Sequence, residues 1–433
     1  QVLSSAASDV YKRQIMINSA SLSGKKILVA VTGSIAAVKA PILVSRLIKA
    51  GAEVKCVITQ SATNLVSPLS LSTLSRNKCY QDKDQWADSQ TKPLHIALAE
   101  WAELIIVAPL SATSLSKFTS GSADGLLASI LLASQSQIVM AAAMNTSMWE
   151  NQSVKKNWNY VKTIDQVITL EPSAGLLACD RVGDGKMVNL DIIEMASESA
   201  FIFHAENKFL TKDLKDIRFL ISAGPTVEAL DAARQLTNRS SGKMGVLIAQ
   251  AAKLRGAEVD LVHGPVSVQQ DLLEGLNTYP VRSSNEMGAK IDDLQPSAQV
   301  IVMAAAVSDF KNNSPSEQKI SKEFFLKSIF DDLEMTSDLI KNQTKKKLEN
   351  QIFLGFAAET GSDNEIIEKG EKKRVSKGCD LLMANPIDRA GQGFDENFNS
   401  GFLLGPKKMV KNLSFSTKLA ISHQLLDEIR NLK

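Results

Sequence analysis

A strand–loop–helix unit occurs once in each half of this chain, and this repeat constrains the fold more than any other feature of the sequence. The first copy has an apolar run over 25–31 and a predicted helix over 35–49, while the second has a strand over 218–222 and a helix over 244–255. Further strands and helical patterns alternate after each copy. Such alternation is typical of open parallel sheets with helices on both faces. We therefore predict an α/β chain with two doubly wound, mainly parallel-sheet (Rossmann-like) domains.

Three segments are expected along the 433 residues. Segment 1–23 has almost no periodicity and is predicted to be an unstructured leader. Charged residues interrupt the apolar runs over 204–216, and we place the boundary between the two domains there. The predicted domains are 24–207 and 208–433, each of a size that suits one hydrophobic core.

The charge and cysteine content disfavour several classes of protein. The 49 basic and 47 acidic residues leave a formal charge of +2, and only 5% of the residues are aromatic. This balance disfavours a broad footprint for nucleic acid. The four scattered cysteines form no CxxC pair, which argues against a disulfide framework or thiolate metal site and favours a reducing cytoplasm. No apolar run reaches the roughly 18 residues of a membrane span, so no membrane partner is expected.

Neither copy of the repeat carries a standard nucleotide-binding fingerprint. The Gly33 turn lacks the GxGxxG spacing of dinucleotide sites. Segment 240–244 (SSGKM) lacks the upstream glycine, and the Ser or Thr after lysine, that a P-loop needs. An ordinary dehydrogenase and a P-loop NTPase are therefore disfavoured.

Small polar residues follow three strands of the first domain. Gly33 and Ser34 precede a helix start, Thr59 ends the next strand, and Ser111 and Thr113 follow a third strand. Free backbone N–H groups at a helix start favour phosphate, although many such turns hold no ligand. Because the carboxyl ends of parallel strands meet at one edge, these hydroxyl groups converge there. We predict that the five residues bind a phosphate-bearing cofactor.

Three further residues of the first domain have side chains that suit chemistry. His95 lies in a helical pattern, which also suits a packing histidine. Asn145 follows a strand over 138–142, where its amide can hold a carboxylate or simply stabilise a turn. Cys179 lies among glycines that indicate a mobile flap, although an isolated cysteine is commonly a buried inert thiol. The residues alone leave these alternatives open.

At these positions the first domain resembles the phosphopantothenoylcysteine decarboxylases. The matching segments, in family order, are 33–37 (GSIAA), His95, 108–113 (APLSAT), 144–149 (MNTSMW) and Ala178–Cys179. The resemblance implies bound FMN, which accepts two electrons from the cysteinyl thiol of the substrate and so assists the loss of carbon dioxide. It also implies that His95 is the active-site base, that Asn145 holds the substrate carboxylate and that Cys179 donates a proton during the final reduction.

The second domain has polar residues in the equivalent loops. Segment 237–245 (TNRSSGKMG) contains hydroxyls, the Asn238 amide and two basic residues ahead of a helix, an arrangement that can surround an anion or simply cap the helix. Asp309 follows a predicted strand as a possible metal or nucleotide contact. Lys373 and Lys377 lie four apart on a predicted helix, where like charges repel by about 0.2–0.5 kcal/mol. An anionic ligand would relieve that repulsion, as would solvation.

These segments resemble the phosphopantothenate–cysteine ligases, which are commonly fused to the decarboxylase in bacteria. The matching segments are 223–226 (AGPT), 237–245, 304–309 (AAAVSD), 319–320 (KI), 355–360 (GFAAET) and 384–385 (AN). The resemblance implies that CTP, together with Mg2+, converts 4'-phosphopantothenate to an acyl-cytidylate. The amine of cysteine then attacks this intermediate. Asn238 would position the acyl-cytidylate, and Lys319 would stabilise charge during attack on the α-phosphate. The implied nucleotide contacts are Ala305, Asp309, Lys319, Phe356, Lys373 and Lys377, and no metal ligand is assigned.

Together the two resemblances predict a bifunctional enzyme of coenzyme A biosynthesis that acts on small molecules and produces 4'-phosphopantetheine. The alternative is a non-catalytic flavin-binding regulatory or interaction subunit of the same fold, which the joint presence of His95, Asn145 and Cys179 disfavours. A prenyl-transfer flavoprotein would leave the second domain unexplained. The resemblance also implies a homo-oligomer, with a trimer-based decarboxylase assembly and a dimeric ligase domain.

Overall fold

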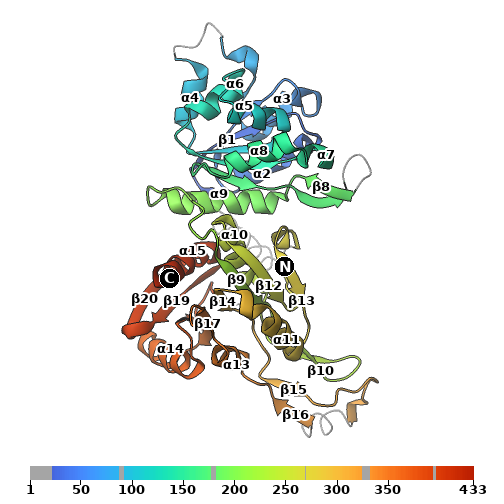
Figure 1. Ribbon diagram of the computed structural model, residues 1–433, viewed down its shortest axis with the longest axis vertical. Coiled ribbons are helices and arrows are strands. Elements are labelled where there is room, and N and C mark those ends of the chain that lie inside the picture. Colours follow the sequence, from blue (N-terminus) through green and yellow to red (C-terminus); the bar gives the residue numbers. More distant parts are fainter. Residues whose placement is uncertain (1–21, 87–91, 177–181, 269, 324–331, 394–395) are drawn as a thin grey trace, which may run out of the picture. The chain divides into compact units, whose positions relative to one another are not determined.

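The computed structural model describes residues 22–86, 92–176, 182–268, 270–323, 332–393 and 396–433. Cys179 and nearly all of the expected leader lie outside the described residues, whereas Leu22, near the end of that leader range, is buried. The chain divides into two compact units, Gln1–Thr211 and Lys212–Lys433 (Figure 1). Each unit contains a mainly parallel sheet with helices on both faces, as the repeat predicts.

The first unit is built on a six-stranded parallel sheet in the order β3-β2-β1-β4-β5-β6. Its strands are β1 (Lys26–Val31), β2 (Glu53–Ile58), β3 (Cys79–Tyr80), β4 (Leu104–Leu110), β5 (Gln137–Ala142) and β6 (Val167–Leu170). Its α-helices are α2 (Ala40–Lys49), α3 (Pro68–Ser75), α4 (Leu94–Trp101), α5 (Ala112–Thr119), α6 (Leu126–Ala133), α7 (Thr146–Trp149), α8 (Gln152–Val161) and α9 (Leu190–His204). The central strands are continuous apolar runs because both of their faces are covered.

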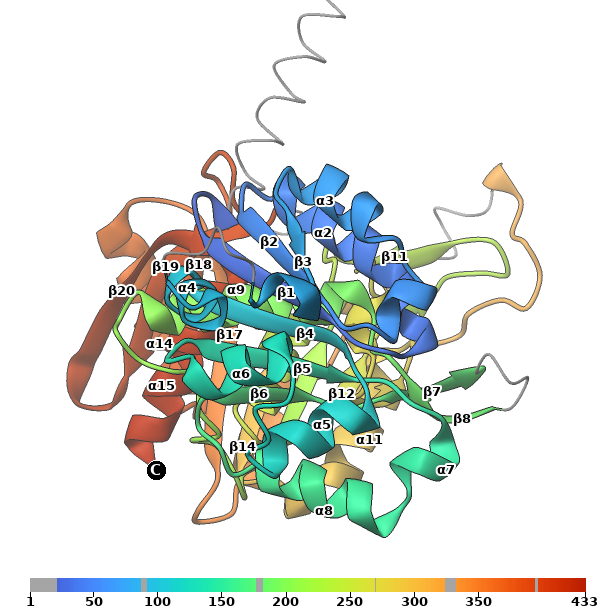
Figure 2. The same ribbon diagram turned by 90° about the horizontal axis from the view of Figure 1, so that it is seen from above.

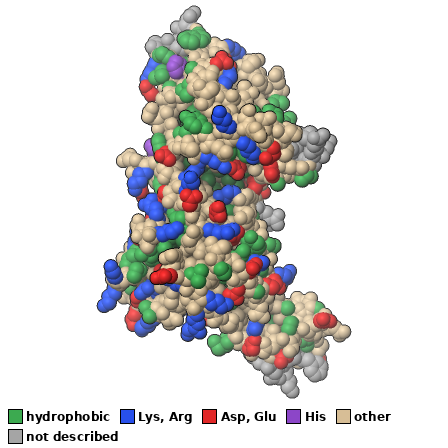
Figure 3. All heavy atoms as spheres, viewed as in Figure 1, with side chains coloured by type: hydrophobic (Ala, Val, Ile, Leu, Met, Phe, Trp, Pro, Cys, Tyr) green, Lys and Arg blue, Asp and Glu red, His purple; other side chains and the backbone are tan. Residues whose placement is uncertain are grey.

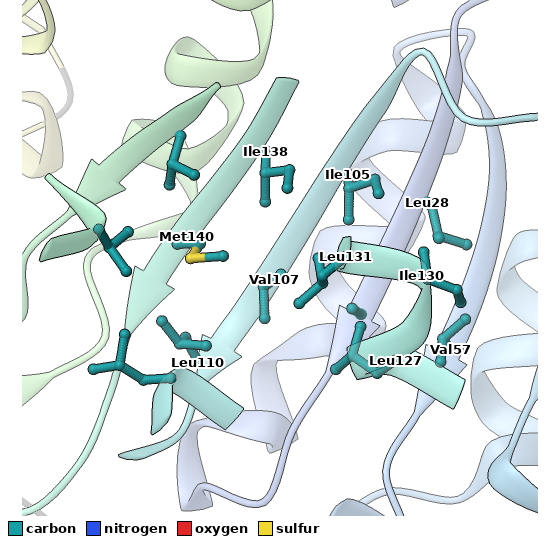
Figure 4. Packing of buried hydrophobic residues seen from close by; sticks show 14 of the residues in the cluster. Leu28, Val57, Ile105, Val107, Leu110, Leu127, Ile130, Leu131, Ile138 and Met140 are labelled. Carbon is teal, nitrogen blue, oxygen red and sulfur yellow. The ribbon is translucent and has the colours of Figure 1, made fainter. Parts of the chain in front are cut away.

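Side-chain alternation along the strands divides the first core into two layers. One layer packs against α4, α5, α6 and α8. Figure 4 shows the strand residues of this layer beside Leu127, Ile130 and Leu131 of α6. Its strand residues include Leu28, Val57, Ile105, Val107, Ile138 and Met140. The intervening strand residues face the other way, where α2 contacts β2 and α9 contacts β4 and β5. This two-sided packing leaves the carboxyl ends of the strands as the place for a site.

The first helix differs from the sequence prediction at its start. The predicted helix over 35–49 begins as the 3-10 segment Ile35–Lys39, and the α-helix starts at Ala40. Pro41 explains the break, because proline has no N–H to donate to residue 37 and its ring disfavours a preceding α-helical turn. The Gly33 turn therefore meets a short 3-10 segment in place of a long α-helix, which weakens the expected contribution of the helix dipole.

A separate two-stranded hairpin extends from the first sheet beside α7 (Figure 2). It consists of β7 (Ser173–Leu176) and the antiparallel strand β8 (Val182–Lys186). The connection between these strands contains Cys179 and lies outside the described residues. The predicted flap therefore has a defined hairpin base.

The second unit has an eight-stranded sheet in the order β13-β12-β9-β14-β17-β18-β19-β20. The strands are β9 (Arg218–Ala223), β12 (Glu258–His263), β13 (Asn277–Pro280), β14 (Val300–Met303), β17 (Ile352–Glu359), β18 (Leu381–Pro386), β19 (Phe398–Gly405) and β20 (Met409–Thr417). Six of these strands pair in parallel. Strands β19 and β20 extend one edge of the sheet as antiparallel strands. Helices α10 (Lys243–Leu254) and α15 (Lys418–Leu432) pack together, whereas α11 (Ser284–Leu294), α13 (Leu339–Lys345) and α14 (Asp363–Lys377) bury apolar residues in two other clusters.

Two short hairpins project from the second sheet as an arm (Figure 1). The first pairs β10 (Val227–Ala229) with β11 (Gln235–Thr237), and the second pairs β15 (Phe310–Asn312) with β16 (Leu333–Met335). The two hairpins contact each other through β10 and β15. Among the described helices of both units, none is long and apolar enough to cross a membrane.

Candidate active sites

A cavity of about 170 Å³ lies at the carboxyl ends of the strands in the first unit. Four of the five predicted cofactor-binding residues line it: Gly33, Thr59, Ser111 and Thr113. Ser34 is not among the lining residues. The cavity is also lined by residues that the sequence did not single out, namely Gln60, Ser61, Asp82, Ser114, Lys117, Asp124, Gly125 and the α6 residues Leu127, Ala128 and Leu131.

Hydrogen bonds between strand ends fix the shape of this first cavity. The buried Thr32 hydroxyl donates to the carbonyl of Pro109 at 2.7 Å and accepts the N–H of Ser111 at 2.8 Å. Ser111 in turn caps α5 by accepting the N–H of Ser114 at 3.3 Å. These bonds tie the end of β1 to the end of β4. Thr32 was missed because a buried threonine at a strand end has no distinctive sequence pattern.

Thr59 carries a buried polar atom that has no hydrogen-bond partner in the structure. Its Oγ1 is buried, although its backbone N–H is satisfied by the carbonyl of Val31 at 3.0 Å. An unsatisfied buried hydroxyl costs roughly 1–3 kcal/mol. Since Thr59 lines the cavity, a ligand oxygen there would remove this cost.

Of the three predicted reactive residues, the two that the structure describes, His95 and Asn145, do not line the first cavity. His95, at the start of α4, is half-buried, and its Nδ1 is buried without a hydrogen-bond partner. Asn145 is exposed and caps α7, where its Oδ1 accepts the N–H of Ser147 at 2.9 Å. Helices α4 and α7 lie on opposite sides of the first unit in both views (Figures 1 and 2). Cys179 lies outside the described residues.

The base of the hairpin does lie against Asn145. The N–H of Met144 donates to the carbonyl of Gly185 at 3.1 Å, and a Cβ at residue 185 would lie 2.2 Å from the Met144 carbonyl oxygen. A Cβ at residue 183 would similarly meet the Thr146 hydroxyl at 2.5 Å. Glycine is therefore required for this close approach. The hairpin that carries Cys179 thus begins next to the Asn145 turn.

A larger cavity, of about 500 Å³, lies in the second unit. Six of the predicted ligase residues line it: Asn238, Ala305, Asp309, Phe356, Lys373 and Lys377. They come from four segments of the chain: the loop after β11, the loop after β14, strand β17 and helix α14. The loop Ser337–Leu339 also lines this cavity.

The N-terminus of α10 forms one wall of the second cavity. Gly242 adopts a left-handed conformation with φ of 74°, and a Cβ there would lie 2.5 Å from Val266. Asn238 is fixed by a hydrogen bond from its Nδ2 to the carbonyl of Val307 at 2.8 Å. The segment therefore presents backbone N–H groups and hydroxyls to the cavity, as expected for an anion site.

Each of the paired lysines on α14 has a carboxylate partner. Lys373 Nζ lies 2.7 Å from Glu359, and Lys377 Nζ lies 3.4 Å from Asp338. The repulsion expected from their spacing is therefore already balanced by acidic side chains. Both lysines remain on the cavity wall, with side chains 47% and 27% exposed, so an anion can still reach them.

The second cavity also contains polar groups that sequence reasoning missed. Lys418 is buried, and its Nζ donates to the carbonyl of Gly393 at 2.8 Å. Asn399 is buried on the same wall, and Thr336 Oγ1 is buried without a hydrogen-bond partner in the structure. Lys418 and Asn399 lie more than a hundred residues beyond the α10 segment, so only the folded sheet reveals their proximity.

Lys319 does not line the second cavity. It is exposed in the connection between β15 and β16, which belongs to the arm. Within the described parts of the chain, no group of three or more His, Cys, Asp or Glu side chains is arranged to hold a metal ion. Basic and acidic side chains are interspersed over the face that Figure 3 displays.

The chain matches two protein families. Residues 15–200 match the family described as Flavoprotein, and residues 214–432 match the family described as DNA/pantothenate metabolism flavoprotein C-terminal domain. A crystal structure of the C-terminal domain of a Coenzyme A biosynthesis bifunctional protein CoaBC is 30% identical, covers 51% of this chain and 97% of that chain, and has a TM-score of 0.42.

Full-length relatives extend over almost the whole chain. The Coenzyme A biosynthesis bifunctional protein CoaBC of Bacillus subtilis is 36% identical over 414 residues, which are 95% of this chain and 98% of the relative. The protein of the same name from Vibrio cholerae is 36% identical over 388 residues, 88% of this chain and 92% of the relative. Because this similarity covers both units, the chain belongs to the CoaBC family of bifunctional coenzyme A biosynthesis proteins.

Proposed function

We propose that this chain catalyses two consecutive steps of coenzyme A biosynthesis. The second unit joins cysteine to 4'-phosphopantothenate with CTP, and the first unit decarboxylates the product to 4'-phosphopantetheine with FMN. One observation carries the proposal: each unit has its own cavity at the carboxyl ends of its parallel strands, and most of the predicted binding residues, all except Ser34 and Lys319, line these cavities. Family membership over nearly the full length disfavours a non-catalytic flavin-binding subunit.

The phosphate group of FMN suits the first cavity. The unpaired Thr59 hydroxyl and the Ser111 and Thr113 hydroxyls supply donors, and Gly33 lines the same cavity. The match to the Flavoprotein family supports the assignment. When bound, FMN supplies an acceptor for two electrons. The cavity is smaller than the roughly 300 Å³ at which pockets for whole ligands begin, so the ring system must lie beyond it.

The reactive residues of the first unit have distinct roles in this proposal. The Asn145 amide hydrogen-bonds the substrate carboxylate and orients it for loss of carbon dioxide. His95, whose Nδ1 has no hydrogen-bond partner, takes the proton of the substrate thiol. Cys179 returns a proton to the product, for which the hairpin connection must reach within about 2.6–3.2 Å of it.

A second copy of the chain would complete the decarboxylase site. Ile35 and Val38 in the 3-10 segment are 56% and 53% exposed, and Ile42 at the start of α2 is 55% exposed, close in sequence to the Gly33 turn. Clustered exposed aliphatic residues mark contact surfaces, whereas isolated ones do not. We propose that a partner copy covers them, in a trimer-based assembly, and contributes His95 or Asn145, which do not line the first cavity of a single chain.

The lysines of the second cavity suit the triphosphate of CTP. Lys373 and Lys377 neutralise phosphate charge, and Asp309, Phe356 and Ala305 line the remaining wall. A carboxylate oxygen of 4'-phosphopantothenate attacks the α-phosphate, and pyrophosphate leaves. The cysteine amine then attacks the acyl carbon, and CMP leaves. Asn238, anchored to Val307, orients the acyl-cytidylate between these steps.

Magnesium would enter together with CTP. Mg2+ commonly binds through one or two carboxylates and substrate phosphates, without a dedicated protein cage. Asp309 and Asp338 are two carboxylates that line the second cavity. They are the candidates to contact a phosphate-bound Mg2+, although Asp338 also pairs with Lys377.

Lys319 requires a second copy of the second unit. The arm that carries it has an exposed apolar pair, Phe310 and Met335, which are directly opposed across β15 and β16 and are 48% and 78% exposed. We propose that this pair docks on a partner in a dimer and that Lys319 acts in a cavity of that dimer.

A cytoplasmic location is also proposed, because Cys56, Cys79 and Cys379 are free thiols.

The test is to incubate the purified chain with 4'-phosphopantothenate, cysteine, CTP and Mg2+ and to follow pyrophosphate and carbon dioxide separately. Both should appear, and the protein should release FMN on denaturation. Asn238→Asp should lower pyrophosphate release while the variant still decarboxylates added phosphopantothenoylcysteine. A protein that neither contains nor binds FMN would refute the first half, and absence of CTP-dependent pyrophosphate would refute the second.

A further inference from the structure

We propose that Asp231 is a positioning residue for the ligase reaction, because its carboxylate holds the peptide group that follows Lys319. This inference rests on the proposed function and concerns the same site. Asp231 lies in the turn between β10 and β11, far from Lys319 in the sequence. Neither residue lines the second cavity. The hydrogen bond that links Asp231 to the peptide group after Lys319 lies in the arm.

The Asp231 carboxylate is fully buried and receives several hydrogen bonds. Its Oδ1 accepts the N–H groups of Ala233 and Arg234, each at 2.8 Å, and its Oδ2 accepts the N–H of Ile320 at 3.3 Å. The side chain is 0% exposed, and Arg234 Nη1 lies 3.4 Å from Oδ2. Burial alone would raise the pKa of Asp231, but the hydrogen bonds from Ala233, Ile320 and Arg234 outweigh it and lower the pKa. The carboxylate therefore stays charged.

The same cluster holds both polar groups of Ile320. While Asp231 accepts its N–H, Arg234 Nη2 donates to its carbonyl at 3.4 Å. A second link between the hairpins runs from Asn312 Nδ2 to the carbonyl of Leu230 at 3.3 Å. The N–H of Ile320 belongs to the peptide bond formed by the carbonyl carbon of Lys319. The hydrogen bond to Asp231 therefore also holds the backbone of Lys319 in place. The Lys319 side chain is long and exposed.

The proposed role of Lys319 requires its ammonium group to be placed accurately, and this arrangement helps to do so. Its side chain is exposed and has four rotatable bonds, so a poorly held backbone would place the ammonium group inaccurately. A fixed charge contributes to catalysis when it is preorganised at the place where charge develops. Asp231 supplies that preorganisation from outside the cavity, without contact to the substrate.

The test is a double-mutant cycle on the full chain, in which kcat and KM for CTP are measured from pyrophosphate release. Asp231→Ala should lower kcat about 10- to 100-fold, because a misplacement of about 1 Å can cost about 10²-fold. KM for CTP should change little, since the lysines of α14 are untouched. In a Lys319→Ala background, adding Asp231→Ala should change kcat by less than about twofold, because the group that it positions is gone.

Two controls keep the outcome decisive. Asp293→Ala removes an exposed carboxylate that also pairs with a cation three residues away, Lys290 at 3.1 Å, and should leave both parameters unchanged. If Asp231→Ala does not show a native melting transition, Asp231→Asn is carried through the same cycle, and it should give a smaller loss in the same direction.

The outcomes separate this inference from the proposed function. Equal fold-losses from the Asp231 change with and without Lys319 would overturn the positioning role, as would an unchanged kcat. If Lys319→Ala is as active as the unmodified chain, the role of Lys319 fails and this inference fails with it. If the unmodified chain itself releases no pyrophosphate, the proposed ligase function is wrong.

Discussion

Replacing Gly185 by alanine is expected to slow decarboxylation severely and to leave ligation intact. The new Cβ would lie 2.2 Å from the Met144 carbonyl oxygen, and real Cβ atoms essentially never approach closer than 3.0 Å. The hairpin and the Asn145 turn must therefore separate by about 0.8 Å, since a backbone oxygen cannot rotate away as a side chain does. The hydrogen bond from the Met144 N–H to Gly185 would be stretched or lost.

The expected loss follows from that displacement. Misplacement of about 1 Å in a catalytic arrangement can cost about 10²-fold, so carbon dioxide release should fall about 10- to 100-fold. The assay uses phosphopantothenoylcysteine for decarboxylation, and CTP-dependent pyrophosphate release from the same sample as an internal control. Pyrophosphate release should be unaffected, because the described residues that line the second cavity all belong to the second unit.

A comparison variant on the same strand tests the geometric reasoning. In Gly183→Ala the Cβ would meet the Thr146 hydroxyl at 2.5 Å, which is a side-chain atom that can turn aside. Its loss of decarboxylation should therefore be clearly smaller than that of Gly185→Ala. Full decarboxylase activity in Gly185→Ala would refute the reasoning, and so would a larger loss in Gly183→Ala.

Two other predictions concern a ligand and a buried ion pair. Thr59→Val removes the unpaired hydroxyl at nearly constant volume and should weaken FMN binding about tenfold, which is roughly 1.4 kcal/mol. Fluorescence titration of the flavin-free protein measures this Kd, and an unchanged Kd would exclude Thr59 from the flavin site. Burial acts to raise the pKa of Asp213, but its hydrogen bonds and charge interactions with Arg255 and Arg430 lower it below its usual value. Its stabilisation is therefore present above the unfolded pKa of about 4 and is lost as the pH falls through the lower folded pKa. Asp213→Asn should cost the second unit about 3 kcal/mol at pH 7 and flatten the acid limb of its stability in urea unfolding, whereas an unchanged acid limb would contradict this assignment.

Much of the fold was predictable because local sequence sets it. The apolar runs at 25–31, 138–142 and 218–222 correspond to β1, β5 and β9 within one residue at each end, since strands buried on both faces require continuous apolar residues. The helix over 244–255 corresponds to α10 in the same way. The start of the first helix was misplaced because a proline one residue inside α2 outweighed the helical pattern before it.

The candidate sites were predictable only in part. Residues that follow parallel strands, such as Thr59, Ser111 and Asp309, line the cavities because the strand direction by itself brings those loops to one edge. Lys418 and Asn399 reach the second cavity through the antiparallel edge of the sheet, which no local pattern indicates.

The sequence by itself determined the two α/β units, their strands and most of the binding loops, because periodicity and turn residues act over a few positions and parallel strands share one direction. Tertiary structure alone decided which distant groups meet: the hairpin glycines against the Asn145 turn, and the Asp231 carboxylate against the peptide after Lys319. It also showed that His95 and Asn145 lie outside the first cavity of a single chain. Such contacts depend on how whole elements pack, and packing energies arise from pairs of residues that the chain brings together only after it folds.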